Sequence, residues 1–370
     1  MVLVLAVGLT VVVSLALGCG LVLLLVPPRA DQAPQPTPRP AAQPTAEAHP
    51  APPRSARSPR PHPAVRWPRP LGRGSTVAVV ATGSRVRDDY LAAGVQVLKG
   101  LGFRIKLGAH VLSASGGRAG TVAERCADFE RAWRDEEVDA IWCARGGHGS
   151  VEMLDRLDWS VVGARDIALV GYSDVTVLQL ALFRRHRLVS ISGPMVASDH
   201  GLGIPGGTPV DTRRLALQWL LRPGGLPAAV RPPRGDAPTT VRPGRAEGFL
   251  LGGNLSRVCD LVGTDYLPDF SNAILVIEDV NETPESITAM LGRLRRAGVF
   301  ARVSGVVLGD FSTCIGRSQL SGAVVTCLDG QDMPVLSDFP YGHIDRPRAT
   351  LPIGAWVRLD ADAGTLTACE

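Results

Sequence analysis

Cysteine is sparse in this chain of 370 residues, and its pattern excludes two kinds of stabilising site. The seven cysteines include no Cys-x-x-Cys pair, and their odd number argues against a disulfide framework. No group of His, Cys, Asp and Glu has the spacing of metal ligands, so we expect no metal and no cofactor. Several cysteines lie in apolar runs and are predicted to be small core residues, which favours a reducing compartment.

Lysine is nearly absent, since only Lys99 and Lys106 occur, and arginine supplies most of the positive charge. Residues 27–74 hold eight arginines against Asp31 and Glu47, which is a formal charge of +6. The whole chain carries +4, so the +6 of this segment leaves −2 for residues 75–370. The basic character therefore belongs to one segment, and we expect no nucleic-acid partner for the rest of the chain.

Charge is absent from residues 2–26, which are apolar apart from a few Gly, Ser and Thr residues. A helix of this length spans about 37 Å, which exceeds the roughly 30 Å hydrocarbon core of a membrane. We therefore predict a single-pass membrane anchor, a transmembrane helix within residues 1–26. A cleaved signal segment and a start codon assigned too far upstream stay open as alternatives. The next arginines, Arg29 and Arg39, favour the cytoplasmic face for the rest of the chain.

Residues 27–74 have the composition of a linker. They contain fifteen of the thirty prolines, together with the eight arginines. Such a segment cannot bury a core, so it is predicted to be extended and disordered. The folded part is expected to begin near residue 75.

From residue 75 to about residue 200, short apolar runs alternate with amphipathic stretches. The apolar runs predict strands at 76–81, 103–107, 138–144 and 167–171. The stretches between and after them predict helices at 88–101 and 121–135, and from residues 151 and 174. This alternation predicts a Rossmann-like parallel sheet over residues 75–200, with the ligand at the carboxyl ends of its strands.

A second domain is predicted over residues 246–370, after a connection at 201–245 that is rich in Gly, Pro and Arg. Its patterns predict a strand and a Gly-Gly turn at 247–256, a strand at 273–280, a helix at 286–297 and a strand at 303–308. The predicted fold class is therefore α/β with two domains, preceded by the transmembrane helix and the linker.

Ser173 lies on the turn between an apolar strand that ends at Gly171 and a helix that begins at Asp174. Such a turn exposes a serine beside the positive end of a helix, which suits a nucleophile. A serine before Asp is also common as a helix N-cap, and this segment alone does not decide between the two roles.

A serine nucleophile needs a base and a group that orients the base. Among the seven histidines, His343 follows an apolar stretch and closes the segment Pro340–His343, where a loop histidine can reach a cleft. Glu278 ends a predicted strand in the same half of the chain. Taken singly, His343 is also compatible with a structural role and Glu278 with an ion pair to an arginine.

Five short motifs occur in a fixed order along the chain: Arg145–Ser150 (RGGHGS), Gly171–Asp174 (GYSD), Gly252–Ser256 (GGNLS), Ile277–Val280 (IEDV) and Pro340–His343 (PYGH). Together they resemble the LD-carboxypeptidases, a family of serine peptidases that includes the microcin-immunity peptidases. The resemblance covers roughly residues 75–360, and five motifs in one order argue against chance.

The resemblance implies a triad in which Ser173 is the nucleophile, Glu278 the acid and His343 the base. It also implies an oxyanion hole made by backbone N–H groups of Asp174 and of the Gly146–Gly147 turn. The residue types agree, because an N–H at a helix start is free to donate and glycines allow close approach of the backbone. Since unperturbed histidine titrates near pH 6.5, kcat/KM is expected to rise between about pH 6 and 7.

Two positions depart from the pattern of the family. His148 stands where the family usually has a tyrosine, and Ala81–Gly83 stands where it usually has Ala-Pro-Ser. We expect both positions to touch the substrate and to affect substrate preference.

The resemblance implies a serine carboxypeptidase that releases D-alanine from murein tetrapeptides by cleaving the bond to an L-configured centre, and the anchor predicted within residues 1–26, which is an addition to the family, would tether it to a membrane. One alternative is an immunity peptidase that hydrolyses a peptidyl-nucleotide antibiotic or an acyl-adenylate, which an aromatic residue placed to stack on the base would favour. Another is a non-catalytic wall-binding module. The expected partners are a murein peptide and, through residues 2–26, a membrane, and homodimer formation is left open.

Overall fold

The computed structural model describes residues 64–204, 209–221, 230, 237–344 and 346–369. The anchor predicted within residues 1–26 and residues 27–63 of the predicted linker lie outside these residues. The prediction of a disordered linker is wrong for residues 64–74, because the N–H of Arg66 donates to the carbonyl of Arg187 at 2.8 Å and the side chain of Leu71 is buried in the apolar core. Within the described part of the chain, no helix is both long and apolar enough to cross a membrane.

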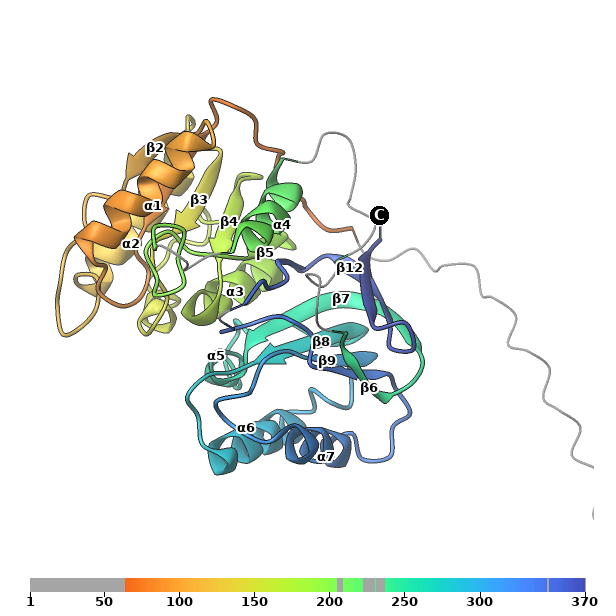
Figure 1. Cartoon of the computed structure of the whole chain (residues 1–370). Helices are drawn as coiled ribbons and strands as arrows, with labels where there is room; N and C mark the ends of the chain where they lie inside the picture. The colour runs from red at the N-terminus through yellow and green to blue at the C-terminus, as the bar shows by residue number, and fades with distance from the viewer. Residues whose placement is uncertain (1–63, 205–208, 222–229, 231–236, 345, 370) are drawn as a thin grey trace, which may run out of the picture. The chain divides into compact units, whose positions relative to one another are not determined.

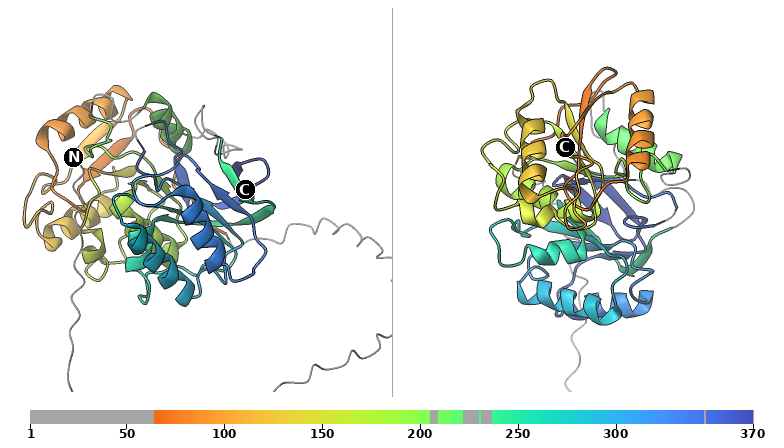
Figure 2. Two further views of the ribbon diagram at one scale, coloured as in Figure 1. Left: turned by 60° about the horizontal axis from the view of Figure 1, so that its bottom comes forward. Right: turned by 90° about the vertical axis from the view of Figure 1, so that its left-hand side faces the viewer.

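The first sheet has six strands in the order β11-β5-β4-β3-β1-β2. Its five parallel strands are β1 (Thr76–Val80), β2 (Arg104–Leu107), β3 (Ala140–Cys143), β4 (Ala168–Gly171) and β5 (Ser190–Ser192). Every residue of β1, β3 and β4 is buried, as expected for parallel strands covered on both faces. The helix α1 (Asp88–Gly100) covers one face and α2 (Val122–Arg134) covers the other (Figure 2).

The strand order β2-β1-β3 creates a switch point, because the chain leaves β1 on one side and later returns on the other. In open α/β sheets, ligands bind beside such a point, at the carboxyl ends of the strands. The turns that follow β1, β3 and β4 meet there. The N–H of Ser84 donates to the carbonyl of Gly146 at 2.9 Å, and Gly146 packs against Ser173. The strand pattern predicts this shared edge, and the contacts confirm it.

The second sheet has seven strands in the order β13-β12-β7-β8-β9-β10-β6. Its parallel strands are β7 (Arg245–Asn254), β8 (Ala273–Glu278), β9 (Gly305–Leu308) and β10 (Val335–Ser337). Antiparallel strands complete both edges: β6 (Thr239–Arg242), β12 (Trp356–Asp360) and β13 (Thr365–Ala368). The connecting helices are α5 (Leu255–Asp260), α6 (Pro284–Arg296) and α7 (Arg317–Cys327), and α6 and α7 lie side by side below the sheet in Figure 1.

One continuous apolar core joins the two domains. The helix α3 (Thr176–His186) brings Phe183 to within 5.4 Å of Phe249 on β7, measured between ring centroids, and the ring of Phe249 meets Trp356 on β12 at 4.8 Å. Because α3 directly follows the Ser173 turn, this packing holds the turn against the second domain.

Three segments differ from the sequence-based expectation. The predicted connection at 201–245 contains the helix α4 (Val210–Leu220) and the edge strand β6. The predicted second domain contributes β11 (Leu351–Ile353) to the first sheet, antiparallel to β5. The helix expected from residue 151 is a single 3-10 turn, Ser150–Met153. Short edge strands such as β6 and β11 have no local pattern of their own, because their partners lie far away in the sequence. The predicted α/β class with two domains is confirmed.

Candidate active site

Ser173 follows β4 on a turn whose backbone conformation is unusual for a residue with a side chain. Its φ is +62°, in the left-handed region, which costs a non-glycine residue on the order of 1–3 kcal/mol. The chain continues as one 3-10 turn, Ser173–Val175, and α3 begins at Thr176 with Val175 as its N-cap. Ser173 is therefore not the N-cap of α3, and that interpretation of the sequence is wrong.

The imidazole ring of His343 lies between Ser173 and Glu278. Nε2 of His343 is 3.0 Å from Oγ of Ser173, and Nδ1 is 2.7 Å from Oε2 of Glu278. A Cβ atom at Gly342, whose φ is +114°, would lie 2.6 Å from Oε2 of Glu278, so the approach of the two groups requires glycine there. The structure thus brings together the three residues predicted to form the triad.

The side chain of Asn254 holds Glu278 in place, and Asp279 holds Asn254. Glu278 is buried, and its other oxygen, Oε1, accepts a hydrogen bond from Nδ2 of Asn254 at 3.3 Å. The same Nδ2 donates to Oδ1 of Asp279 at 2.9 Å, while Oδ2 of Asp279 accepts from the N–H and the hydroxyl of Ser256. Sequence reasoning did not assign Asn254 and Asp279 to the site. Their position inside two of the ordered motifs was the only signal.

The predicted oxyanion-hole residues lie next to Ser173. A Cβ atom at Gly146 would be 3.3 Å from Cβ of Ser173 and 3.4 Å from the backbone nitrogen of Asp174. Asp174 is the second residue of the 3-10 turn, so its N–H has no acceptor within the helix. Gly147 has a φ of +90°, and a Cβ atom there would clash with Oγ of Ser84. The left-handed backbone and this clash require glycine at Gly147, and a side chain at Gly146 would crowd Ser173.

The side chain of Asp174 is fully buried behind the same turn. Its Oδ2 accepts the N–H of Ser150 at 2.9 Å, and its Oδ1 lies 3.6 Å from Nη1 of Arg257 on α5. Burial raises the pKa of Asp174, while the hydrogen bonds with Ser150 and the charge of Arg257 oppose that shift. The carboxyl group therefore links the loop after β3, the Ser173 turn and the second domain.

A cleft of about 570 Å³ opens in front of Ser173 and His343. This volume is within the range of small-molecule sites. Ser173, His343, Gly146 and Gly147 line the cleft, whereas Glu278 and Asp174 lie buried behind it. The remaining lining residues come from both domains: Arg145, His148, Tyr172, Met195, Ser198, Asp199, His200, Asn254, Ser256, Arg257, Asp279, Val280, Asn281, Glu282 and Thr313.

His148 lies on the cleft wall, where its side chain can meet a ligand. Thr82 does not. Thr82 is completely buried, and its hydroxyl accepts a hydrogen bond from Oγ of Ser150 at 2.9 Å. The expectation that Ala81–Gly83 touches the substrate is therefore wrong for Thr82, because the turn after β1 packs beneath the loop after β3.

Family comparisons cover both domains. Residues 77–193 match the LD-carboxypeptidase N-terminal domain, and residues 247–359 match the LD-carboxypeptidase C-terminal domain. The chain belongs to the LD-carboxypeptidase family. The resemblance seen in the five motifs is thereby confirmed, and this LD-carboxypeptidase is a serine-type carboxypeptidase, a hydrolase.

Similar proteins are found in several bacteria. A carboxypeptidase homologue of Streptomyces coelicolor is 37% identical over 81% of this chain and 95% of its own length. The murein tetrapeptide carboxypeptidase of Pseudomonas aeruginosa is 30% identical over 74% of this chain and 89% of its own. The microcin C7 self-immunity protein MccF of Escherichia coli is 26% identical over 81% of this chain and 95% of its own length.

Solved structures share the fold of this LD-carboxypeptidase. The muramoyltetrapeptide carboxypeptidase of Oxalobacter formigenes has a TM-score of 0.67 at 28% identity, over 79% of this chain and 97% of that one. MccF in complex with glutamyl sulfamoyl guanosine has a TM-score of 0.74 at 23% identity, over 83% of this chain and 99% of the MccF chain. The second of these likenesses concerns the fold alone.

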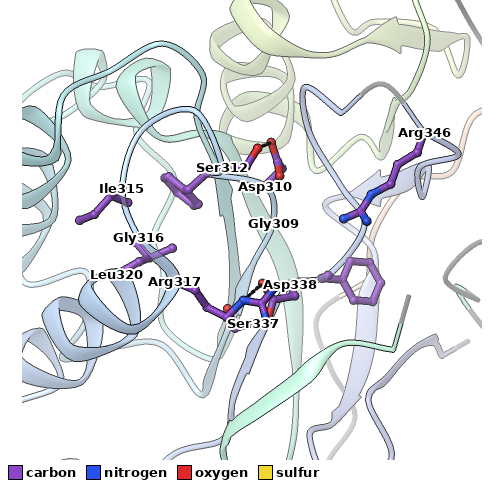
Figure 3. A pocket seen from close by; sticks show the side chains of 12 residues that line it. Gly309, Asp310, Ser312, Ile315, Gly316, Arg317, Leu320, Ser337, Asp338 and Arg346 are labelled. Carbon is purple, nitrogen blue, oxygen red and sulfur yellow. Dashed lines mark hydrogen bonds and ion pairs between the residues drawn. The ribbon is translucent and has the colours of Figure 1, made fainter. Parts of the chain in front are cut away.

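A second cavity of about 270 Å³ lies at the carboxyl ends of β9 and β10 (Figure 3). Gly309 separates it from the acid of the candidate triad, since a Cβ atom there would be 3.0 Å from Cβ of Glu278. Two of its charged groups form an ion pair, Arg317 with Asp338 at 2.8 Å, and Asp310 accepts a hydrogen bond from the hydroxyl of Ser312 at 3.0 Å. No serine–histidine pair is among its described lining residues, so the cleft in front of Ser173 is the candidate active site of this LD-carboxypeptidase.

Opposing effects act on the pKa of His343, which is mostly buried. Burial by itself lowers the pKa, while the negative charge of Glu278 and its hydrogen bond to Nδ1 raise it. The contributions of Glu278 outweigh burial, and the pKa of His343 lies above the ordinary value of 6.5. Protonated His343 cannot accept a proton from Ser173.

We therefore predict that the acidic limb of the kcat/KM profile has its midpoint above pH 6.5. Activity rises as His343 loses its proton, and a raised pKa moves this rise to higher pH than the interval from 6 to 7 expected from sequence alone. Initial rates at low substrate concentration across pH 5 to 9 measure the midpoint. A midpoint below pH 6 would contradict the assignment of this limb to His343.

Proposed function

We propose that this LD-carboxypeptidase removes the C-terminal D-alanine of murein tetrapeptides through a Ser-Glu-His acyl-enzyme mechanism. The observation that carries the proposal is the alignment of Ser173, His343 and Glu278, at 3.0 Å and 2.7 Å, within a cleft shared by two domains. The names of similar proteins supply the substrate class, since one is a murein tetrapeptide carboxypeptidase and another a muramoyltetrapeptide carboxypeptidase.

The first half of the proposed reaction forms the acyl-enzyme. Nε2 of His343 takes the hydroxyl proton of Ser173 while Oγ attacks the carbonyl carbon of the bond before D-alanine. The carboxylate of Glu278 keeps the proton on Nδ1 and stabilises the imidazolium that forms. Backbone N–H groups of Asp174 and of the Gly146–Gly147 turn receive the negative charge of the carbonyl oxygen.

The second half releases the products. His343 returns its proton to the nitrogen of D-alanine, the C–N bond breaks, and an ester remains on Ser173. A water molecule then gives a proton to His343 and attacks the ester carbonyl, which releases the shortened peptide and restores the Ser173 hydroxyl. The strained backbone of Ser173 supports this role, because nucleophiles on tight strand-to-helix turns are held in one orientation.

An immunity peptidase that acts on a peptidyl-nucleotide or an acyl-adenylate is the second candidate, and the likeness to MccF favours it. A nucleotide base needs an aromatic surface on which to stack. Among the described residues that line the cleft, Tyr172 is the one Phe, Tyr or Trp, and its buried ring packs between Arg348 and His343. Among these described residues there is thus no free Phe, Tyr or Trp face for a base to stack on, which supports the murein peptide.

The wall-binding alternative has less support. A non-catalytic module has no need for a histidine aligned between a serine and a buried glutamate, nor for a serine held at positive φ. Such strained residues persist where the geometry serves a function.

The deciding experiment incubates the full-length protein with a purified murein tetrapeptide and detects free D-alanine by mass spectrometry. Release of D-alanine that EDTA leaves unchanged is the expected result. A parallel incubation with an aminoacyl sulfamoyl adenosine, read by loss of the amino acid, tests the immunity function. Cleavage of the second substrate alone would replace the proposal by the immunity peptidase, and cleavage of neither would favour the wall-binding module.

We further propose that residues 2–26 anchor the enzyme in a membrane and that the linker keeps the catalytic domains mobile beside it. Residues 64–74 of the predicted linker pack on the folded part of the chain, and the 37 residues from 27 to 63 could reach about 115 Å in a fully extended polyproline II form. We predict that the full chain sediments with membranes and resists alkaline carbonate, which strips peripheral proteins but leaves spanning helices inserted. Soluble full-length protein with an intact N-terminus would exclude the anchor, and a mature N-terminus beyond residue 26 would indicate a cleaved signal.

A further inference from the structure

A carboxypeptidase must distinguish the last residue of a peptide from internal ones. The distinguishing group is the free carboxylate of that residue, which lies one residue beyond the bond that is cleaved. One residue spans less than about 4 Å, so the group that binds this carboxylate must lie close to the oxyanion hole. Arginine is the side chain best suited to it, because its planar fork of donors matches a carboxylate.

Two arginines are among the described residues of the cleft wall, Arg145 and Arg257. Arg257 already serves two carboxyl groups of the protein. Its Nη1 lies 2.9 Å from Oδ2 of Asp260 and 3.6 Å from Oδ1 of the buried Asp174, and its side chain is 15% exposed. If Arg257 turned away to bind a substrate, the buried carboxyl group of Asp174 would lose its counter-charge, which costs free energy. We therefore assign Arg257 a structural role, the stabilisation of the Ser173 turn through Asp174.

Arg145 is engaged much more weakly. Its side chain is 29% exposed, and its one carboxylate partner within ion-pair distance, among the described residues, is Asp199 at 3.2 Å. The side chain of Asp199 is itself 68% exposed. Ion pairs this accessible to water contribute about 0–1 kcal/mol, so an arriving carboxylate can replace Asp199 at little cost. A further hydrogen bond, from Nη1 of Arg145 to the carbonyl of Arg85 at 3.1 Å, orients the guanidinium group.

The chain also places the backbone of Arg145 beside the proposed oxyanion hole. Arg145 directly precedes Gly146, and Gly146 packs against Ser173 and the backbone nitrogen of Asp174. Arg145 therefore lines the cleft from a backbone position one residue away from the proposed oxyanion hole, and its guanidinium group reaches Asp199, which also lines the cleft. The short loop after β3 thus carries both the proposed oxyanion donors and this cation.

We infer that Arg145 binds the C-terminal carboxylate of the peptide and that Asp199 holds its guanidinium group ready until the substrate displaces it. This inference rests on the proposed carboxypeptidase function and adds the residue that makes the enzyme specific for a free chain end. Arg145 acts here in recognition, because it lies beside the reacting groups and exchanges no proton with them.

The test compares two tetrapeptides that differ only at the chain end, one with D-alanine and the other with D-alaninamide. We expect the wild-type enzyme to have a higher kcat/KM for the acid than for the amide. In Arg145→Gln, the ratio of the two values should fall by about 10- to 100-fold, which corresponds to the loss of charge-assisted hydrogen bonds to a carboxylate. Arg145→Lys should give an intermediate ratio, because it keeps the charge and loses the fork.

Arg134→Gln is the matched control. It removes one positive charge and two partly exposed ion pairs, to Glu130 at 2.9 Å and to Asp158 at 3.8 Å, outside the cleft. The acid-to-amide ratio of this variant should equal that of the wild type. Thermal unfolding reports whether Arg145→Gln is folded, and if it is not, Arg145→Lys carries the same comparison.

Two outcomes separate this inference from the function on which it rests. An unchanged acid-to-amide ratio in a folded Arg145 variant that still releases D-alanine would overturn the inference and leave the proposed function intact. Absence of D-alanine release by the wild-type enzyme would overturn the proposed function, and the role of Arg145 in it as well.

Discussion

Replacement of Ser173 by alanine is expected to reduce kcat for D-alanine release by about 10⁴-fold or more. The hydroxyl is the only group that can form the proposed acyl-enzyme, and Nε2 of His343 at 3.0 Å would be left with no nucleophile to activate. What remains is the stabilisation that the oxyanion hole and substrate binding provide. The measurement is the rate of D-alanine release by the purified full-length variant, with its fold checked by circular dichroism.

Ser160→Ala is the control for this substitution. Ser160 is exposed, and its hydroxyl donates to Asp158 at 2.5 Å, away from the residues that line the cleft. This variant should keep the wild-type rate within about twofold. A Ser173→Ala protein that retains a tenth of the wild-type kcat would show that Ser173 is not the nucleophile.

Glu278→Gln is expected to reduce kcat by about 10⁴-fold, the loss seen when the acid of a serine triad becomes an amide. Glutamine has nearly the same size, but it cannot stabilise the imidazolium form of His343. Its amide nitrogen can also face Nδ1, which then favours the wrong tautomer of the ring. Steady-state kinetics on the tetrapeptide measures the loss, and Glu285→Gln at the exposed start of α6 controls for the lost charge.

A second measurement on Glu278→Gln separates electrostatic support from a packing defect. The charge and the hydrogen bond of Glu278 raise the pKa of His343, so their removal should move the acidic limb of the residual kcat/KM profile to lower pH. A packing defect alone would lower the rate without moving the limb. A limb at the wild-type position would therefore argue against Glu278 as the partner of His343.

Local patterns in the sequence determined much of the fold. Buried parallel strands are continuous apolar runs, and this is why β1, β3 and β4 were predicted within a few residues of their observed bounds. The helix α2 was predicted from the helical spacing of the apolar residues Val122, Cys126, Phe129 and Trp133, and the structure adds a capping box between Thr121 and Glu124 at its start. By contrast, β11 pairs with β5, a strand about 160 residues earlier, and nothing in its three residues indicates that partner.

For the candidate site, too, some features follow from the sequence and others only from the tertiary structure. The strand-turn-helix pattern around Ser173 and the order of the five motifs are properties of the sequence, and they were sufficient to single out Ser173, Glu278 and His343. Their meeting is a tertiary property, since Ser173 and His343 are 170 positions apart and come from different domains. The pKa of His343, the burial of Thr82, the support of Glu278 by Asn254 and the weak pairing of Arg145 depend on distances between remote segments. Hydrophobic periodicity and turn chemistry act over a few residues, so the sequence determined which groups are present, and only the packing of the two domains decided which of them touch.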